Sequence, residues 1–181
     1  LDGTNQRQIT TSGNVSTVKF LTKNQVVVIS QGQIWKINLS VGKKTKLVRF
    51  SQRYRWVHTL ACSPNGKWIL AAVERTLDAE DTLFYDLFLI DARTGRSQIF
   101  VKDVVLWDDY PRLSVSDQNL FYSSIKEKDF YPIVVVKDLK KGKERILYQA
   151  PNPMGLERIL DISVAKKSDK ILIAVSYTHL R

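Results

Sequence analysis

Few side chains in this sequence have the types and the spacing that catalysis or metal binding requires. Two histidines are present, His58 and His179, and no Gly-x-Ser-x-Gly motif supplies a nucleophile for a hydrolase. The single cysteine, Cys62, lies in an apolar stretch, which is typical of a small core residue rather than of a reactive thiolate. The acidic segment 74–82 lacks the ligand spacing of a calcium-binding loop. The sequence therefore predicts no catalytic residue, no metal site and no cofactor, and a structural or channel-lining role for His58.

The chain is basic overall. Lys and Arg number 28 against 18 Asp and Glu, a formal net charge of +10, and such an excess occurs in proteins that bind nucleic acids or anionic surfaces. Lysines also protect the exposed turns and edges of β-proteins, and the turns that carry them here hold no aromatic residues on which bases could stack. No apolar run reaches the length of about 18 residues that a membrane-spanning helix needs. We expect a protein or peptide partner rather than nucleic acid, and the oligomeric state stays open.

Three segments with a common pattern indicate the elements that must position these side chains. Each is a β-branched or aromatic stretch that ends in Asn or Asp, turns at a glycine four residues later and returns as a second strand. The Asx–Gly pairs are Asn38 and Gly42, Asp91 and Gly95, and Asp138 and Gly142. Successive copies lie 53 and 47 residues apart, which is close to the repeat length of propeller blades. The sequence predicts an all-β protein, a β-propeller of four-stranded antiparallel blades.

The recurrence of Asn38, Asp91 and Asp138 at one position of the repeat has two interpretations. The functional one is a ring of ligands. The structural one is an Asx side chain that bonds the backbone of its own turn, and it explains the recurrence without any partner. We therefore assign these residues and their glycines to structural turns. A further turn is predicted at Pro64 and Gly66, because proline presets φ and glycine tolerates positive φ.

The blade boundaries follow from the spacing of these turns. The expected units are the end of a blade at residues 1–10, three blades at 15–50, 57–101 and 109–150, and the start of another at 159–174. Residues 57–62 and 109–114 are expected to form innermost strands. Roughly three and a half blades are present on this interpretation, and no segment requires a helix.

These motifs resemble the TolB-like, WD-type family of β-propellers. Residues 63–67, Ser-Pro-Asn-Gly-Lys, resemble that family's S-P-D-G-K turn, and residues 109–114, Asp-Tyr-Pro-Arg-Leu-Ser, its D-x-P-x-W-S strand. Residues 91–95 are similar to its D-x-x-T-G hairpin, and residues 2–10 to its D-G-x-N-x-R-x-L-T blade ending. The resemblance implies about six blades in the intact protein. It also implies a periplasmic or other extracytoplasmic location, with envelope proteins as partners.

The last residues, 175–181, depart from the pattern of strands and turns. Their sequence, Val-Ser-Tyr-Thr-His-Leu-Arg, resembles the translation of a sequencing-adapter end. We therefore expect a partial propeller at residues 1–174, taken from a longer protein, followed by a non-native tail. Such a tail should lack a strand partner or pair poorly. The alternative is an ordinary third strand of the last blade.

The expected topology places the turns of the blades at two ends. The turns within hairpins carry most of the lysines and share one end. The other end carries the acidic segment 74–82 and further acidic residues, so the two ends are expected to differ in the sign of their charge. The residues expected to contact a partner at the mouth of the central channel and in the blade-connecting loops are Arg55, His58, Trp107, Asp108, Asp109 and Arg158. We expect a non-enzymatic propeller that binds another protein or peptide. The alternative is the substrate-gating propeller of a prolyl-oligopeptidase-like serine peptidase whose catalytic domain lies outside this sequence.

Overall fold

The computed structural model contains fourteen strands and, in the part of the chain that it describes, no helix. It describes residue 8 and residues 14–76, 83–106, 110–126, 130–152, 157–165 and 170–177. The first two sheets comprise β1 (Val15–Thr22), β2 (Gln25–Ser30), β3 (Gln33–Asn38), β4 (Lys44–Lys46), β5 (Tyr54–Cys62), β6 (Trp68–Arg75), β7 (Leu83–Asp91) and β8 (Ser97–Leu106). The other two comprise β9 (Leu113–Val115), β10 (Asn119–Lys126), β11 (Tyr131–Asp138), β12 (Glu144–Gln149), β13 (Glu157–Val164) and β14 (Ile171–Tyr177).

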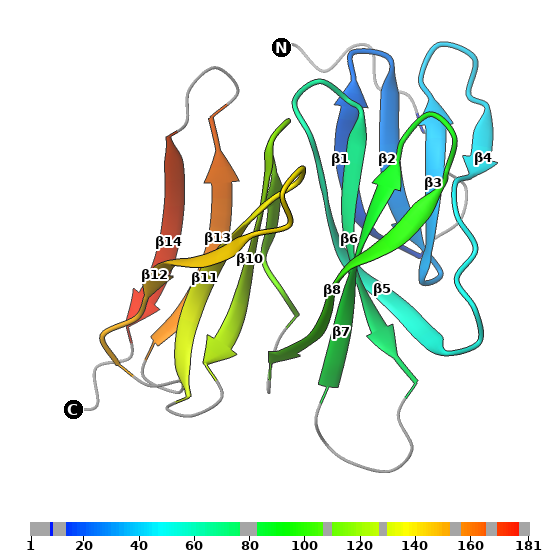
Figure 1. Cartoon of the computed structure of the whole chain (residues 1–181). Helices are drawn as coiled ribbons and strands as arrows, with labels where there is room; N and C mark the ends of the chain where they lie inside the picture. The colour runs from blue at the N-terminus through cyan, green and yellow to red at the C-terminus, as the bar shows by residue number, and fades with distance from the viewer. Residues whose placement is uncertain are drawn as a thin grey trace.

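Each sheet is an antiparallel meander in which every strand pairs with the strand next to it in sequence. Three sheets have four strands, in the orders β1-β2-β3-β4, β5-β6-β7-β8 and β9-β10-β11-β12, and the fourth pairs β13 with β14. Figure 1 shows these sheets following one another across the molecule from the N-terminal to the C-terminal side. The predicted fold class, all-β with four-stranded antiparallel blades, is confirmed. None of the described residues belongs to a helix long and apolar enough to cross a membrane.

Middle strands of the sheets are apolar on both faces, and β6 is covered on its two sides by the first and third sheets. In β6, the run Ile69–Val73 is at most 1% exposed at every residue, and in β2 the run Val26–Ile29 is at most 2% exposed. Strands buried on both faces need such continuous apolar runs rather than alternation. The outer strands β4 and β12 have mostly exposed or half-buried side chains instead.

The hydrophobic core consists of layers between consecutive sheets. Ile69 and Ala71 point from β6 toward the first sheet, where they join a cluster with Val27 and Ile34. Leu70 and Ala72 point to the opposite side, into a cluster shared with the third sheet. A third layer, built around Val134 and Ile162 among others, joins the third sheet to β13 and β14. Each sheet is therefore held by its neighbours in sequence, as expected for a blade.

The first strands of the sheets lie side by side along the inner edge of the stack. β5 contacts β1 on one side and β9 on the other, and β9 also contacts β13. This arrangement agrees with the expected innermost position of residues 57–62. Residues 107–109 lie outside the described part of the chain, so the second expected inner strand is observed only from Leu113 onward.

Two boundaries differ from those expected. β5 begins at Tyr54 rather than at residue 57, because Tyr54 pairs with Arg75 and its ring packs on Phe50 and Phe88 at centroid distances of 6.1 and 5.0 Å. β14 continues to Tyr177, which pairs with Glu157, while Val175 packs against the third core layer. The expectation that the segment after residue 174 lacks a strand partner is therefore wrong for residues 175–177. Its non-native origin stays a prediction.

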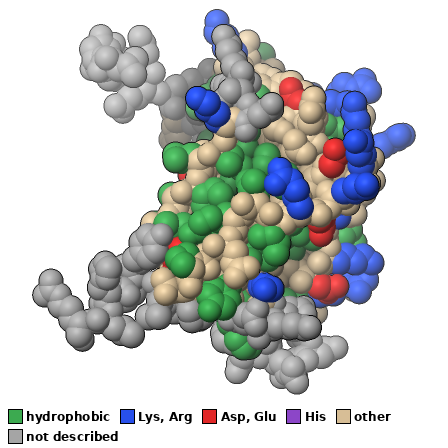
Figure 2. Space-filling model, turned by 60° about the vertical axis from the view of Figure 1, so that its left-hand side comes forward, with side chains coloured by type: hydrophobic (Ala, Val, Ile, Leu, Met, Phe, Trp, Pro, Cys, Tyr) green, Lys and Arg blue, Asp and Glu red, His purple; other side chains and the backbone are tan. Residues whose placement is uncertain are grey.

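The outer faces of the first and last sheets expose apolar side chains. On β1, Phe20 is 72% and Val18 is 54% exposed, and on β14 Leu172 is 69% exposed. Figure 2 turns the side with β13 and β14 forward and shows hydrophobic side chains gathered there, with Lys and Arg along one margin. In the second and third sheets, the equivalent faces are buried against a neighbouring sheet.

Candidate functional site

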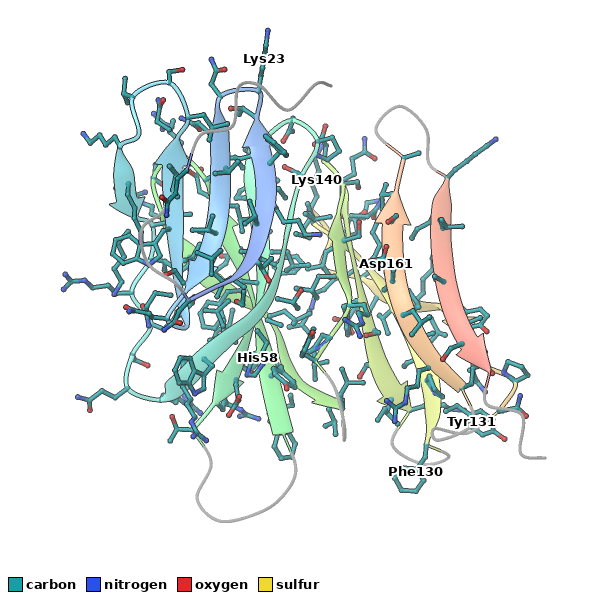
Figure 3. The ribbon with its side chains drawn as sticks, turned by 180° about the vertical axis from the view of Figure 1, so that it is seen from behind. Lys23, His58, Phe130, Tyr131, Lys140 and Asp161 are labelled. Carbon is teal, nitrogen blue, oxygen red and sulfur yellow. The ribbon has the colours of Figure 1, made fainter. Side chains whose placement is uncertain are left out.

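The candidate site is the end of the molecule at which β5, β9 and β13 begin, here called the mouth. Arg55 and His58 come from β5, Tyr110 precedes β9, and Arg158 lies at the start of β13. Phe130, which precedes β11, and Tyr131, the first residue of β11, lie at the same end, and His58 lies above them in the view of Figure 3. Of the predicted contact residues, Arg55, His58 and Arg158 are thus placed toward one end by strands that start there. Trp107, Asp108 and Asp109 lie outside the described residues.

His58 is fixed at the mouth by a carboxylate and two aromatic rings. Its Nε2 contacts Oε2 of Glu74, a carboxylate on β6 whose side chain is 10% exposed. The imidazole stacks on Tyr110 at 5.9 Å between centroids and meets the edge of Tyr85 at 5.5 Å. Arg55 Nη1 lies 4.0 Å from the other oxygen of Glu74, and its own side chain is 67% exposed. His58 therefore has a fixed orientation, while Arg55 is available to solvent.

Among the described residues, no nucleophilic side chain is hydrogen-bonded to this histidine–carboxylate pair. In the part of the chain that the structure describes, Glu74 is the sole hydrogen-bond partner of His58, so no Ser, Thr or Cys side chain is bonded to the ring. Burial raises the pKa of the Cys62 thiol to about 12, which keeps it protonated at neutral pH. Within the same residues no group of three His, Cys, Asp or Glu side chains could hold a metal ion.

Sequence reasoning missed Glu74 and Tyr110 as partners of His58. The register shifts between Val57 and Thr59 in the pairing of β5 with β6, and this bulge sits at His58. A bulge changes the direction in which a side chain points, and whether one forms depends on the pairing with the neighbouring strand. The contact between His58 and Glu74 therefore cannot be predicted from the residues around His58 alone.

A second polar cluster, also unforeseen, stabilises the second sheet near the mouth. Asp86 is 2% exposed, accepts a 2.8 Å hydrogen bond from the Tyr54 hydroxyl and accepts another, of 3.1 Å, from the backbone N–H of Asp103. Asp103 has a φ of 59° and lies in a stretch of β8 where the register shifts. Arg75 contacts the carboxylates of both aspartates. Burial and the hydrogen bond to Asp86 raise the pKa of Tyr54 to about 12. This cluster fixes the bulged strand and is structural.

The three repeated Asx side chains bond their own turns. Oδ1 of Asn38 accepts from the Ser40 amide at 2.9 Å, Oδ1 of Asp91 from the Thr94 amide at 2.7 Å, and Oδ1 of Asp138 from the Lys141 amide at 2.7 Å. The amides of Gly42, Gly95 and Gly142 close the same turns, with φ values of 69°, 75° and 66°. These hydrogen bonds hold the pKa of Asp91 and Asp138 below the usual range for aspartate. The side chains are used within the chain and form no ring of ligands.

The turn at residues 63–67 is closed in a related way. The Ser63 hydroxyl donates to Asn65 Oδ1 at 2.8 Å and accepts from the Trp68 amide at 2.9 Å, with Pro64 between them in the turn. Gly66 has a φ of 70°, and a Cβ added there would lie 2.7 Å from the carbonyl oxygen of Leu21. The turns of the second sheet therefore also pack against the first.

Comparison with known proteins gives the fold and leaves the activity open. No protein-family model and no curated protein sequence matches the chain. A structure assigned as TolB from Agrobacterium tumefaciens is 14% identical, with a TM-score of 0.64 over 95% of this chain and 61% of that one. A chain in a nidogen/laminin complex is 13% identical, with a TM-score of 0.61 over 88% of this chain and 56% of that one. The tricorn protease is 16% identical, with a TM-score of 0.53 over 87% of this chain and 16% of that one.

The chain thus spans less than two thirds of the length of each of these structures. Identities this low show the fold alone, and one of the three structures is an enzyme. Together with the four sheets and their layered core, these likenesses show that the chain has a β-propeller fold like that of TolB.

Proposed function

We propose that the chain is a non-enzymatic binding module that presents its mouth to another protein or peptide. One observation carries the proposal: aromatic rings and an arginine are exposed together at the mouth. Tyr110 is 39%, Phe130 43% and Trp56 on β5 44% exposed. Arg55 is next to Trp56 in the sequence, and its side chain is 67% exposed. Aromatic residues and arginine are the side chains that contribute most to binding energy in protein interfaces.

The support from other proteins is limited to the fold. One of the similar structures is a chain of a nidogen/laminin complex, so a propeller of this type occurs in a protein–protein complex. Another is the tricorn protease, which keeps open the alternative that the mouth filters peptides for a peptidase domain. The described residues offer His58 and Glu74 but no nucleophile bonded to them, which favours the binding module.

The test is selection of peptides that bind the purified chain from a displayed library of random dodecamers. We expect selected peptides whose affinity falls about tenfold or more in the variants Arg55→Ala and Phe130→Ala, because such side chains contribute about 2 kcal/mol each when they anchor an interface. Phe20→Ala is the matched control, since Phe20 is also an exposed aromatic residue but lies on the outer face of β1.

Two results would contradict the proposal. Equal losses in Phe20→Ala and Phe130→Ala would place binding elsewhere than at the mouth. Cleavage of the selected peptides by the wild-type chain, abolished in His58→Ala, would show an enzyme. The gating alternative is supported instead if the intact gene continues into a Gly-x-Ser-x-Gly motif followed by Asp and His.

A further inference from the structure

The end opposite the mouth carries many exposed lysine and arginine side chains. It is formed by the hairpin turns of the successive sheets, and Figure 3 shows Lys23 and Lys140 at this end, far from Phe130 and Tyr131. We call it the tip surface and define it by its exposed cations: Lys23, Lys43, Lys44, Lys67, Arg93, Arg96, Lys140, Lys141 and Lys143. Among the described residues, none of these side chains forms a salt bridge, although five such contacts occur elsewhere.

Among the described residues at this end, the carboxylates of Asp91, Asp138 and Glu144 are engaged within the chain, and Asp117 is exposed. Asp91 and Asp138 accept hydrogen bonds from the amides of their own turns, at 2.7–2.9 Å. Glu144 accepts from Nζ of Lys137 at 2.8 Å, and Lys137 is not part of the tip surface. In the described part of this end, three carboxylates therefore have hydrogen-bond partners within the chain, whereas none of the nine cations has a carboxylate partner.

The same turns lack the features that bind phosphate or bases. Successive backbone N–H groups in a turn can form a nest for a phosphate oxygen, but here the Asx side chains fill those nests. The nearest large rings, Trp35 and Trp68, are half-buried and lie under Lys44 and Lys67, whose Nζ atoms are 4.3 and 4.9 Å from the ring centroids. Apart from Phe20, which is 72% exposed on the outer face of β1, no described aromatic residue near the tip surface is open for stacking, which nucleic-acid strands require.

We propose that the tip surface binds an acidic, extended polypeptide segment rich in Asp and Glu. Lysine predominates over arginine among its cations, and a lysine ammonium is a point charge on a flexible stem that accommodates carboxylates without fixed geometry. The charges are distributed over three sheets, with Lys43 on the first, Lys67 on the second and Lys140 on the third. A partner must cross successive blades to use them, which suits an extended chain. This site goes beyond the proposed function, because it lies at the other end of the molecule from the mouth.

The experiment measures binding of a fluorescein-labelled dodecamer of glutamate to the whole chain by fluorescence anisotropy. In the variant K140E/K141E we expect affinity about tenfold weaker, because each reversal replaces an attraction by a repulsion of similar size. The matched control is R49E/K102E, which changes the net charge equally at exposed residues away from the tip surface and should weaken binding less than about twofold. Binding to the wild-type chain should also weaken as sodium chloride rises from about 0.05 to 0.3 M.

A second variant, K23E/K43E, reverses two charges on the first sheet and should also weaken binding about tenfold. If K140E/K141E loses its β-sheet circular dichroism and is therefore unfolded, the affinity of K23E/K43E for the glutamate peptide tests the proposal instead. Equal weakening in the tip variants and in the control would show attraction to net charge alone and would overturn the proposal. Tighter binding of a dodecamer of thymidylate than of the glutamate peptide would also overturn it, in favour of nucleic acid. Peptide binding at the mouth is scored with different variants, so the two proposals can fail separately.

Discussion

Replacing Gly95 with alanine tests whether the second sheet packs on the first as the structure shows. Gly95 has a φ of +75°, and a Cβ added there would overlap the backbone carbonyl oxygen of Leu47. Leu47 directly follows β4, the last strand of the first sheet. Gly142 is its counterpart in the third sheet, with a φ of +66° and no atom within 4 Å of the added Cβ. Both substitutions therefore carry the free-energy cost of a non-glycine residue at positive φ. Only Gly95→Ala adds a steric overlap with the preceding sheet.

The expected magnitudes follow from these two terms. A non-glycine residue in the left-handed region costs about 1–2 kcal/mol, which is the whole expected effect of Gly142→Ala. Overpacking against a neighbour that must move adds about 1–3 kcal/mol, so Gly95→Ala should lower the free energy of unfolding by about 3 kcal/mol. In thermal unfolding, each kcal/mol lost from the free energy of unfolding should lower Tm by about 2–4 °C for a chain of this size.

Urea unfolding followed by tryptophan fluorescence measures both variants. We expect both midpoints to fall, the larger fall in Gly95→Ala, with no change in the dependence of the unfolding free energy on urea. Equal destabilisation by the two substitutions would refute the reasoning, because it would mean that Leu47 and the Gly95 turn are not in contact in solution.

Two further predictions concern buried polar groups of the second sheet. Because burial raises the pKa of the Cys62 thiol to about 12, a disulfide reagent at pH 8 should label the native chain about a hundredfold more slowly than the urea-unfolded chain; rapid native labelling would contradict this. Tyr54→Phe removes the hydroxyl that donates to buried Asp86 and should lower the free energy of unfolding by about 1–3 kcal/mol. Tyr131→Phe is the control, because that hydroxyl has no hydrogen-bond partner among the described residues, and an equal loss there would refute the role assigned to Asp86.

The features that could be predicted from sequence are those set by neighbouring residues. The turns at Asn38, Asp91 and Asp138 depend on one side-chain oxygen and on a glycine four residues later, so three copies in one sequence were enough to indicate blades. Continuous apolar runs such as Ile69–Val73 indicate strands covered on both faces.

The features that could not be predicted depend on register between strands. His58 meets Glu74 because of a bulge in β5, and Asp86 meets the Asp103 amide through a bulge in β8. A bulge shifts the pairing by one residue, and no local pattern distinguishes it from a regular strand of the same composition. The pairing of Val175 with Ile159 was missed for a related reason, because a departure from the usual turn motifs does not prevent an apolar residue from packing on the preceding sheet.

The pairing of each strand with its sequence neighbour has a consequence for how the protein forms during synthesis. Within a sheet, β1 to β4 need no strand from later in the chain, and the same holds for β5 to β8. Hairpins form in about 1–10 μs, whereas ribosomes add about 5–20 residues each second, so each sheet can be complete before the next one emerges. The nascent chain then grows by adding one finished layer to another. At every stage the newest layer has one uncovered apolar face, as β14 has at Leu172, and this face is where a nascent propeller is most open to aggregation.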